Sequence, residues 1–162
     1  MAHHLSTRLE LACPVEQVFE FFSKAENLER ITPPELHFRI LTPRPIAMQQ
    51  GTLIDYELRL FLARFHWRTE IQNWDPPHQF VDVQVKGPYR EWVHRHRFIP
   101  TSIGTAILDD VQYRLPLFPI GELAFPVVRL QLARIFSYRR QAIRRWLAER
   151  GTPSAGMPRA AS

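Results

Sequence analysis

The chain has little cysteine and glycine and no long apolar run, and each scarcity excludes a class of protein. Its single cysteine, Cys13, excludes a disulfide within the chain and fits a reducing compartment. None of the six glycines belongs to a Gly-x-Gly-x-x-Gly pattern after a strand, which excludes the Rossmann fingerprint. There is no run of about 18 apolar residues and no charged-then-apolar signal pattern at the N-terminus. We therefore expect a soluble, cytoplasmic protein.

What the chain does contain indicates one globular domain. It has 162 residues, of which 45% are hydrophobic and 23% are charged, as is ordinary for a soluble protein. The net charge is +5, but the arginines are spread along the chain, which is more typical of a solvated surface than of a nucleic-acid partner. We predict a single domain over residues 1–150 and a disordered tail over residues 151–162.

The hydrophobic periodicity predicts the order of the elements. Residues 4–12 alternate like a strand, and helical spacing follows from Pro14 and again over residues 27–31. The period then returns to two, and turn residues separate six strands, near 36–42, 52–62, 65–74, 79–86, 90–99 and 104–115. Past Gly121 an amphipathic pattern predicts one long helix that ends near Arg150. The short connections between strands favour an antiparallel sheet.

The strand over residues 90–99 carries the most informative pattern. Because side chains alternate along a strand, Trp92, His94, His96 and Phe98 share one face, while the other face is mostly charged. The charged face suits water, so we expect the four rings to point inward. Two histidines between two aromatic residues predict a mostly apolar cavity with a few polar groups, which is the usual make-up of a small-molecule site.

Two carboxylates are predicted to join these histidines across the neighbouring hairpins. The turns place Asp82 opposite His94, and Asp109 beside His94 or His96, with Cβ atoms about 4.5–5.5 Å apart. Such a cluster orients a ligand or supplies acid–base chemistry, and a purely structural network of satisfied polar groups is the alternative. Two histidines and Asp109 also have the composition of a metal site, but we assign no metal and no other cofactor.

Other chemistry has less support. No serine lies in a Gly-x-Ser-x-Gly turn, and Cys13 is far in sequence from the polar cluster, so we assign no catalytic nucleophile. The apolar, proline-interrupted segment between the last strand and the long helix leaves two alternatives open. It either packs against the edge of the sheet or makes transient membrane contact near Leu117–Phe125.

Several local strings carry a family resemblance over residues 4–148. They include Pro14-Val15-Glu16-Gln17-Val18-Phe19-Glu20-Phe21-Phe22, Asp75-Pro76-Pro77, Trp92-Val93-His94-Arg95-His96 and Tyr113-Arg114-Leu115-Pro116. These resemble the SRPBCC superfamily (START-like, polyketide cyclase/dehydrase-like), and within it an uncharacterised bacterial subgroup. The resemblance implies an α+β helix-grip fold. In this fold a curved seven-stranded antiparallel sheet wraps around a long C-terminal helix, two short helices follow the first strand, and a deep cavity lies between sheet and helix.

We therefore predict that the protein binds a hydrophobic or aromatic small molecule, such as a lipid, a quinone or a polyketide-like compound. A cyclase- or dehydratase-type enzyme that uses the same pocket is the first alternative, and an interaction module with a filled core is the second. The sequence leaves the oligomeric state open. The expected pocket residues are Tyr56, Leu58, Trp67, Phe80, Asp82, Trp92, His94, His96, Phe98, Asp109, Val111, Tyr113, Val128, Leu132 and Phe136.

Overall fold

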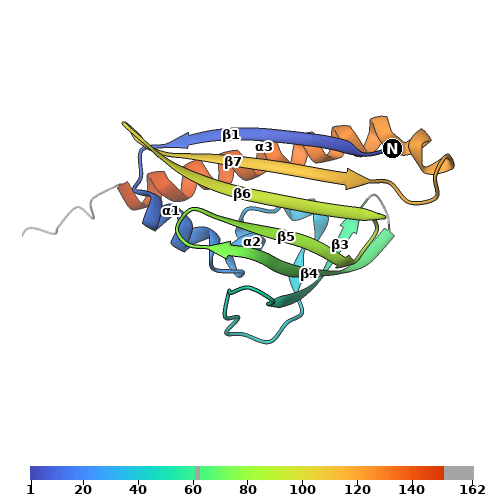
Figure 1. Ribbon diagram of the computed structural model, residues 1–162, viewed down its shortest axis with the longest axis horizontal. Coiled ribbons are helices and arrows are strands. Elements are labelled where there is room, and N and C mark those ends of the chain that lie inside the picture. The colour runs from blue at the N-terminus through green and yellow to red at the C-terminus, as the bar shows by residue number, and fades with distance from the viewer. Residues whose placement is uncertain (61–62, 152–162) are drawn as a thin grey trace, which may run out of the picture.

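A computed structural model describes residues 1–60 and 63–151, and a curved antiparallel sheet is its main element (Figure 1). The strands are β1 (His3–Leu11), β2 (Arg39–Ile40), β3 (Leu53–Leu60), β4 (Ala63–Asp75), β5 (Gln79–Lys86), β6 (Glu91–Thr101) and β7 (Gly104–Arg114). Their order in the sheet is β1-β7-β6-β5-β4-β3-β2, and each neighbouring pair is antiparallel. The consecutive strands β2 to β7 therefore form a meander, which β1 extends at its β7 edge.

Helical segments lie on the inner face of this sheet, except for one 3₁₀ turn in the exposed link before the last helix. They are α1 (Val15–Phe22), α2 (Asn27–Arg30), the 3₁₀ turns η1 (Pro34–Leu36) and η2 (Ile120–Ala124), and the long helix α3 (Phe125–Gly151). Figure 1 shows α3 running along β1, β7 and β6, with α1 and α2 near its C-terminal end. The expected helix-grip architecture is thus confirmed, with seven strands and one long C-terminal helix. The predicted tail lies outside the described residues, except that Gly151 is the last residue of α3.

The predicted strand over residues 36–42 is mostly wrong. Leu36 ends the turn η1, and only Arg39–Ile40 pairs with β3. His37 has a left-handed backbone with φ of 44°, which interrupts the extended conformation that a strand needs. Pro43 and Pro45 follow at once, and proline has no N–H with which to extend the ladder.

The curvature of the sheet has a local cause in β4. The pairing of β4 with β5 shifts register between Arg68 and Thr69 and again between Gln72 and Asp75. Such irregularities bend the bulged strand and increase its twist. Figure 1 shows the result, because β3 and β4 run at a steep angle to β1, β7 and β6. The bend creates a concave inner face that α3 can cover along one side only.

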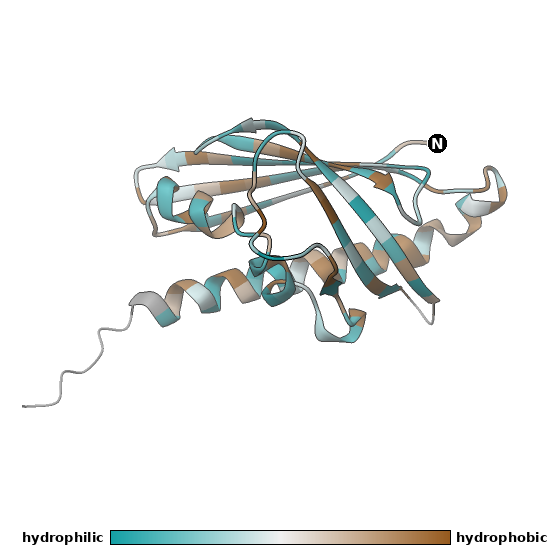
Figure 2. Ribbon diagram, turned by 90° about the horizontal axis from the view of Figure 1, so that it is seen from below, coloured by the Kyte–Doolittle hydropathy of each residue, from teal (hydrophilic) through white to brown (hydrophobic). Residues whose placement is uncertain are grey.

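The core is built largely from aromatic rings. Around α1, the rings of Phe19, Phe22 and Phe80 pack on Phe98, with centroids 5.1 to 6.1 Å away. A second packed group combines strand residues such as Trp92 with the buried face of α3. In Figure 2, hydrophobic stretches recur along α3 and along the strands that it crosses.

The link between β7 and α3 leaves large apolar side chains in water. Leu117 is 79% exposed, Phe118 61%, Ile120 72% and Leu123 83%, whereas Leu115 is buried. Of the two alternatives for this link, packing against the sheet therefore applies to Leu115 but not to these four exposed residues. Within the described ranges, no helix is long and apolar enough to cross a membrane.

Candidate functional site

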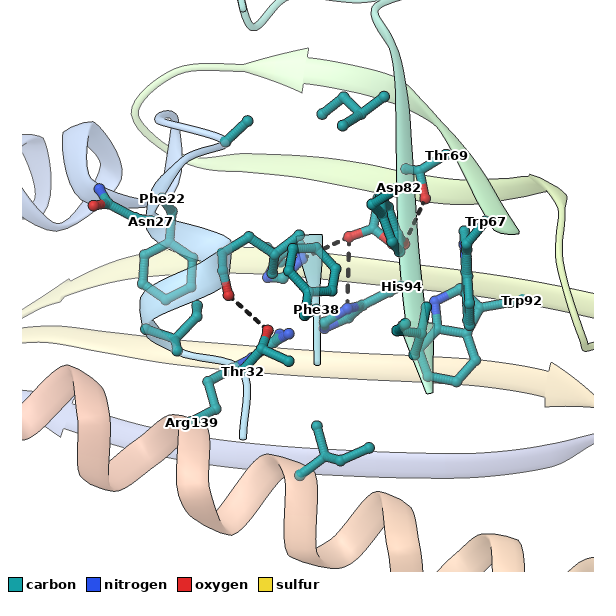
Figure 3. Close-up of a pocket in the computed structure, with 18 of the residues that line it drawn as sticks. Phe22, Asn27, Thr32, Phe38, Trp67, Thr69, Asp82, Trp92, His94 and Arg139 are labelled. Carbon is teal, nitrogen blue, oxygen red and sulfur yellow. Dashed lines mark hydrogen bonds and ion pairs between the residues drawn. The ribbon is translucent and has the colours of Figure 1, made fainter. Parts of the chain in front are cut away.

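A cavity lies between the concave face of the sheet, the α1–η1 region and the middle of α3. Its volume is about 150 Å³, counted as the space open to the centre of a water molecule. Aromatic and aliphatic side chains form most of its wall. Figure 3 shows Trp67 and Trp92 together at one end, Phe22 and Asn27 at the other, and Asp82 and His94 between them.

Four polar residues form a closed cluster at the sheet side of this cavity. Asp82 Oδ2 lies 2.9 Å from His96 Nε2 and 3.6 Å from His94 Nδ1. Asp109 Oδ1 lies 3.1 Å from His94 Nε2 and 2.8 Å from His96 Nδ1. The two imidazole rings face each other, with centroids 3.8 Å apart. One carboxylate oxygen at each end thus serves both rings, and we call these four residues the His–Asp cluster.

The register of three neighbouring strands explains this arrangement. Asp82 on β5 pairs with His94 on β6, and His96 on β6 pairs with Asp109 on β7. Both pairings agree with the prediction from the hairpin turns. Since side chains alternate along each strand, all four residues lie on the concave face.

The cluster is buried, but its two ends differ. His94, His96 and Asp109 are buried, while the side chain of Asp82 is 20% exposed and lines the cavity. Asp109 does not line the cavity, because the two histidines lie in front of it. Thr7 Oγ1 donates a hydrogen bond to the other Asp109 oxygen, at 3.3 Å. Asp82 is therefore the end of the cluster that a molecule in the cavity would meet.

Burial and mutual charge move the pKa of each member. Burial would raise the pKa of Asp109, but the hydrogen bonds and charges of both histidines outweigh it and hold that pKa well below its usual range. The pKa of Asp82 is lowered for the same reason, with Arg139 contributing. Burial would lower the pKa of His96, but the two carboxylates outweigh it and raise that pKa. For His94, burial and then the charge of His96 prevail, so its pKa is lowered.

These directions favour one charge state near neutral pH. His96 is the imidazolium and His94 is neutral, while both carboxylates are ionised. His94 Nε2 has hydrogen-bond geometry toward Asp109, so its single proton belongs there. His94 Nδ1 then presents a lone pair on the Asp82 side, and the four groups together carry one net negative charge.

Arg139 supplies a positive charge to the same cavity, so this arginine does not belong to the solvated surface that the spread of arginines along the chain predicts. It rises from α3 into the cavity (Figure 3), with its guanidinium carbon 5.0 Å from the centre of the Phe136 ring. Leu132, Phe136, Arg139 and Ile143 follow one another at helical spacing of three or four residues. That spacing is the signal that identifies Arg139 as part of the inward stripe.

Trp67 and Arg139 on the cavity wall each carry a buried donor atom without a partner among the described residues. Among the described residues, neither Trp67 Nε1 nor Arg139 Nε has a hydrogen-bond acceptor, although both atoms are buried. Tyr56 and Thr69, in contrast, satisfy each other through a hydrogen bond of 3.0 Å between their hydroxyl oxygens. A buried donor without a partner costs free energy, and an acceptor atom on a bound molecule would remove this cost.

The structure separates the expected pocket residues into two groups. Those that line the cavity are Tyr56, Leu58, Trp67, Phe80, Asp82, Trp92, His94, His96, Leu132 and Phe136. Those that do not line it are Phe98, Asp109, Val111, Tyr113 and Val128. Residues of the second group lie where neighbouring side chains pack directly onto them. Phe98, for example, is covered by Phe19 and Phe22, and Tyr113 by the rings of His3 and Trp92.

Sequence reasoning missed wall residues outside the strands. These are Phe21, Phe22, Lys24, Ala25, Asn27, Leu28, Ile31, Thr32, Leu36, Phe38, Met48, Ile135 and Arg139. Tyr89, Ile54, Leu60, Thr69 and Ile71 on or beside the strands also line the cavity. For the four strand residues, the inward parity of β3 and β4 was a sufficient signal. For the segment from α1 to η1 there was no such signal, because its position depends on how it folds over the sheet.

Comparisons with solved structures show the same fold in proteins of low sequence identity. The Zhui aromatase/cyclase from Streptomyces is 14% identical with a TM-score of 0.77, and covers 97% of this chain and 100% of its own. A START superfamily protein from Mycobacterium smegmatis is 15% identical with a TM-score of 0.69, and covers 91% and 98%. A norcoclaurine synthase from Thalictrum flavum is 13% identical with a TM-score of 0.69, and covers 94% and 98%. At these identities the likeness shows the fold alone.

The family assignment comes from the sequence profile. No curated protein matches the chain. The profile of the family described as "Polyketide cyclase / dehydrase and lipid transport" matches residues 11–136, which run from the last residue of β1 to the middle of α3 and include the whole His–Asp cluster. The chain therefore belongs to the polyketide cyclase/dehydrase and lipid transport family.

Proposed function

We propose that this protein binds a hydrophobic or aromatic small molecule that carries at least one oxygen acceptor. The cavity supports this proposal, because an apolar wall with a few polar groups is typical of small-molecule sites. By the same measure of volume one water needs about 10–15 Å³, so the cavity has room for on the order of ten atoms. That size suits one or two fused rings. A longer lipid or polyketide would require the cavity to open.

The polar groups favour an acceptor on the ligand. Trp67 Nε1 and Arg139 Nε are buried donors without a partner among the described residues. A carbonyl, phenol or carboxylate oxygen would accept from either of them, and the aromatic wall would stack on the ring. The family supports a ligand of this class, since it includes cyclases, dehydrases and lipid carriers by its description.

The proposal is tested by identifying a co-purified ligand and by titrating the protein with an aromatic probe. Mass spectrometry of material extracted from the native protein identifies a co-purified compound. In parallel, 1-naphthol, an aromatic probe of suitable size with one hydroxyl group, is titrated while tryptophan emission is followed. Trp67 and Trp92 line the cavity, so we expect a saturable change in emission.

A matched pair of variants shows whether the probe binds in the cavity. Ile54→Phe adds volume to the cavity wall, and Leu53→Phe makes the same kind of change at the exposed neighbouring position. We expect Ile54→Phe to weaken binding by about tenfold or more, and Leu53→Phe to leave it unchanged. Equal affinities of the two variants would place the ligand elsewhere and refute the proposal.

A second candidate function is acid–base catalysis on the bound molecule. Two neighbouring groups whose environments move their pKa values apart are typical of an acid and base pair, and His96 and His94 have this relation. A cyclase- or dehydratase-type reaction needs such proton transfers. Once a substrate is identified, His94→Gln should reduce the turnover rate by about 10²–10⁴-fold and leave the affinity for that substrate nearly intact. A carrier would show no turnover with or without the change.

A further inference from the structure

We propose that Asp82, His94 and His96 form a binding site for one divalent transition-metal ion, such as Zn²⁺, on the wall of the cavity. Each of these three residues offers one ligand atom, and the three atoms lie within 4.8 Å of one another. Asp82 Oδ2 is 3.6 Å from His94 Nδ1 and 2.9 Å from His96 Nε2. Two ligand atoms bound to zinc at about 2.0–2.1 Å with a tetrahedral angle are about 3.3–3.4 Å apart. The observed distances lie on either side of this value, so only small movements would admit an ion.

The set of ligand atoms fits a site that keeps one position open. Two imidazole nitrogens and one carboxylate oxygen are the protein ligands of many catalytic zinc and non-haem iron sites. All three residues line the cavity. The remaining coordination position would therefore face the cavity, where an oxygen atom of a bound molecule could occupy it.

Asp109 provides the support that such a site needs. Its Oδ1 lies 3.1 Å from His94 Nε2 and 2.8 Å from His96 Nδ1, which are the nitrogens that face away from Asp82. Metal-binding histidines usually donate their second N–H to a carboxylate, which fixes the ring orientation. Here Asp109 has hydrogen-bond geometry to His94 and also lies beside the second nitrogen of His96. The sequence pattern suggested Asp109 as a metal ligand, but the structure gives that position to Asp82 and makes Asp109 a positioning residue.

The charges near the site favour a cation. With both histidines neutral, as metal ligands must be, Asp82 and Asp109 contribute two negative charges, against which the cavity wall places the guanidinium of Arg139 and the ammonium of Lys24. Lys24 forms an ion pair with Glu20 at 2.7 Å, which leaves its charge compensated. A divalent ion would thus meet a net negative site. Asp82 is the residue of this site that is most exposed to the cavity.

The test measures binding of the metal alone, so its result is independent of the organic ligand. The full chain carries His3→Ala and His4→Ala, because His3 Nε2, 2.8 Å from a Glu122 oxygen, belongs to a competing group of ligand atoms near the N-terminus. After treatment with chelator, isothermal titration with Zn²⁺ should show one equivalent bound with a Kd in the micromolar range or tighter. No binding of Zn²⁺ would overturn the proposal.

Three substitutions in this background locate the site. Asp82→Asn keeps the shape and removes the anionic ligand, and should weaken binding at least tenfold. Asp109→Asn should weaken it by about 10–100-fold through the loss of ring orientation. Asp110→Asn is the matched control, because Asp110 is the next residue on the outer face and pairs with Arg97. Equal affinity of the Asp82 and Asp110 variants would contradict the proposal.

A spectroscopic measurement covers the case in which a cluster variant fails to fold. Co²⁺ in a four-coordinate site with nitrogen ligands absorbs strongly in the visible range, whereas hydrated or six-coordinate Co²⁺ absorbs weakly. The parent chain with Co²⁺ should give the strong spectrum, and Zn²⁺ should displace it. A weak spectrum at saturating Co²⁺ would count against the site as described.

Discussion

Replacing Asp109 by Asn tests whether the His–Asp cluster is a charged network. Asn has nearly the same shape as Asp, but it carries no charge and has only one oxygen acceptor. Asp109 accepts a hydrogen bond from His94 at 3.1 Å, lies 2.8 Å from His96, and accepts from Thr7 at 3.3 Å. After the change, the imidazolium of His96 keeps only Asp82 as a counter-charge. A donor NH₂ group also faces one of the former hydrogen-bond donors.

The magnitude follows from the burial of the partners. Removing one partner of a buried ion pair costs about 3–5 kcal/mol, because the other charge stays buried without compensation. Asp82 still compensates His96, so we expect the lower end, about 3 kcal/mol of unfolding free energy. A domain of this size has about 5–15 kcal/mol in total, so the variant should still fold.

Urea unfolding at pH 7 measures the change, with metal removed by chelator and the tryptophans as reporters. Asp110→Asn serves as control, since Asp110 forms an ion pair with Arg97 near the surface and such pairs contribute about 0–1 kcal/mol. The Asp109 variant should lose clearly more stability than the control. If both variants lose the same small amount, Asp109 is not paired with charge as described, and the assignment of charges in the cluster is wrong.

Three further predictions concern pH, the core and the surface. The raised pKa of His96 stabilises the fold below its unfolded value of about 6.5, and this contribution is lost as pH rises through the folded pKa. Because the pKa of His94 is lowered, the fold loses stability as pH falls below about 6.5. The urea midpoint of the metal-free protein should therefore be highest near pH 6.5. A midpoint that rises steadily to pH 9 would contradict these two pKa shifts. Phe98→Ala should cost about 3–5 kcal/mol in the same unfolding assay and leave 1-naphthol affinity unchanged, because Phe98 is buried but does not line the cavity; lower affinity would show that the cavity reaches it. Leu123→Asp should reduce sedimentation with anionic lipid vesicles, which the net charge of +5 favours as partner, whereas Val85→Asp at another exposed apolar position should not; equal sedimentation would refute membrane contact at this link.

The facing residues and their register were predictable because they follow from local rules. Alternation along β6 determines which side chains share a face, and the short turns on either side set the pairing. A shift of one residue would have moved His94 and His96 to the outer face. The pair of Asp82 with His94 was therefore accessible from the sequence, and Asp109 was placed beside one of the two histidines, of which the structure selects His96.

The limits of the cavity were not predictable in this way. Parity says that Phe98 and Tyr113 face inward, but it does not say which part of that face another element covers. The rings of Phe19 and Phe22 come from α1, which lies far from β6 in sequence, and they close the space above Phe98. This information depends on the packing of α1 and α3 over the sheet.

Arg139 shows a different limit. A hydrophobic pattern treats every arginine as a solvent-facing residue, so it assigns Arg139 to the outer side of α3 by its charge. Its aliphatic stem and its contact with Phe136 make the inward position possible, since long charged side chains can lie along apolar surface. At this site, the position of a residue in the inward stripe of α3 predicts the direction of its side chain better than its residue type does.

The sharing of two oxygen atoms by two rings has a consequence for how this site can evolve. A change at any one of the four positions leaves a buried charge or donor without its partner, so single steps away from the cluster are costly. Relatives are therefore expected either to keep all four residues or to replace them together with apolar ones. Within the family, the four positions would then be inherited as one unit, and their joint presence would mark the relatives that share this protein's chemistry.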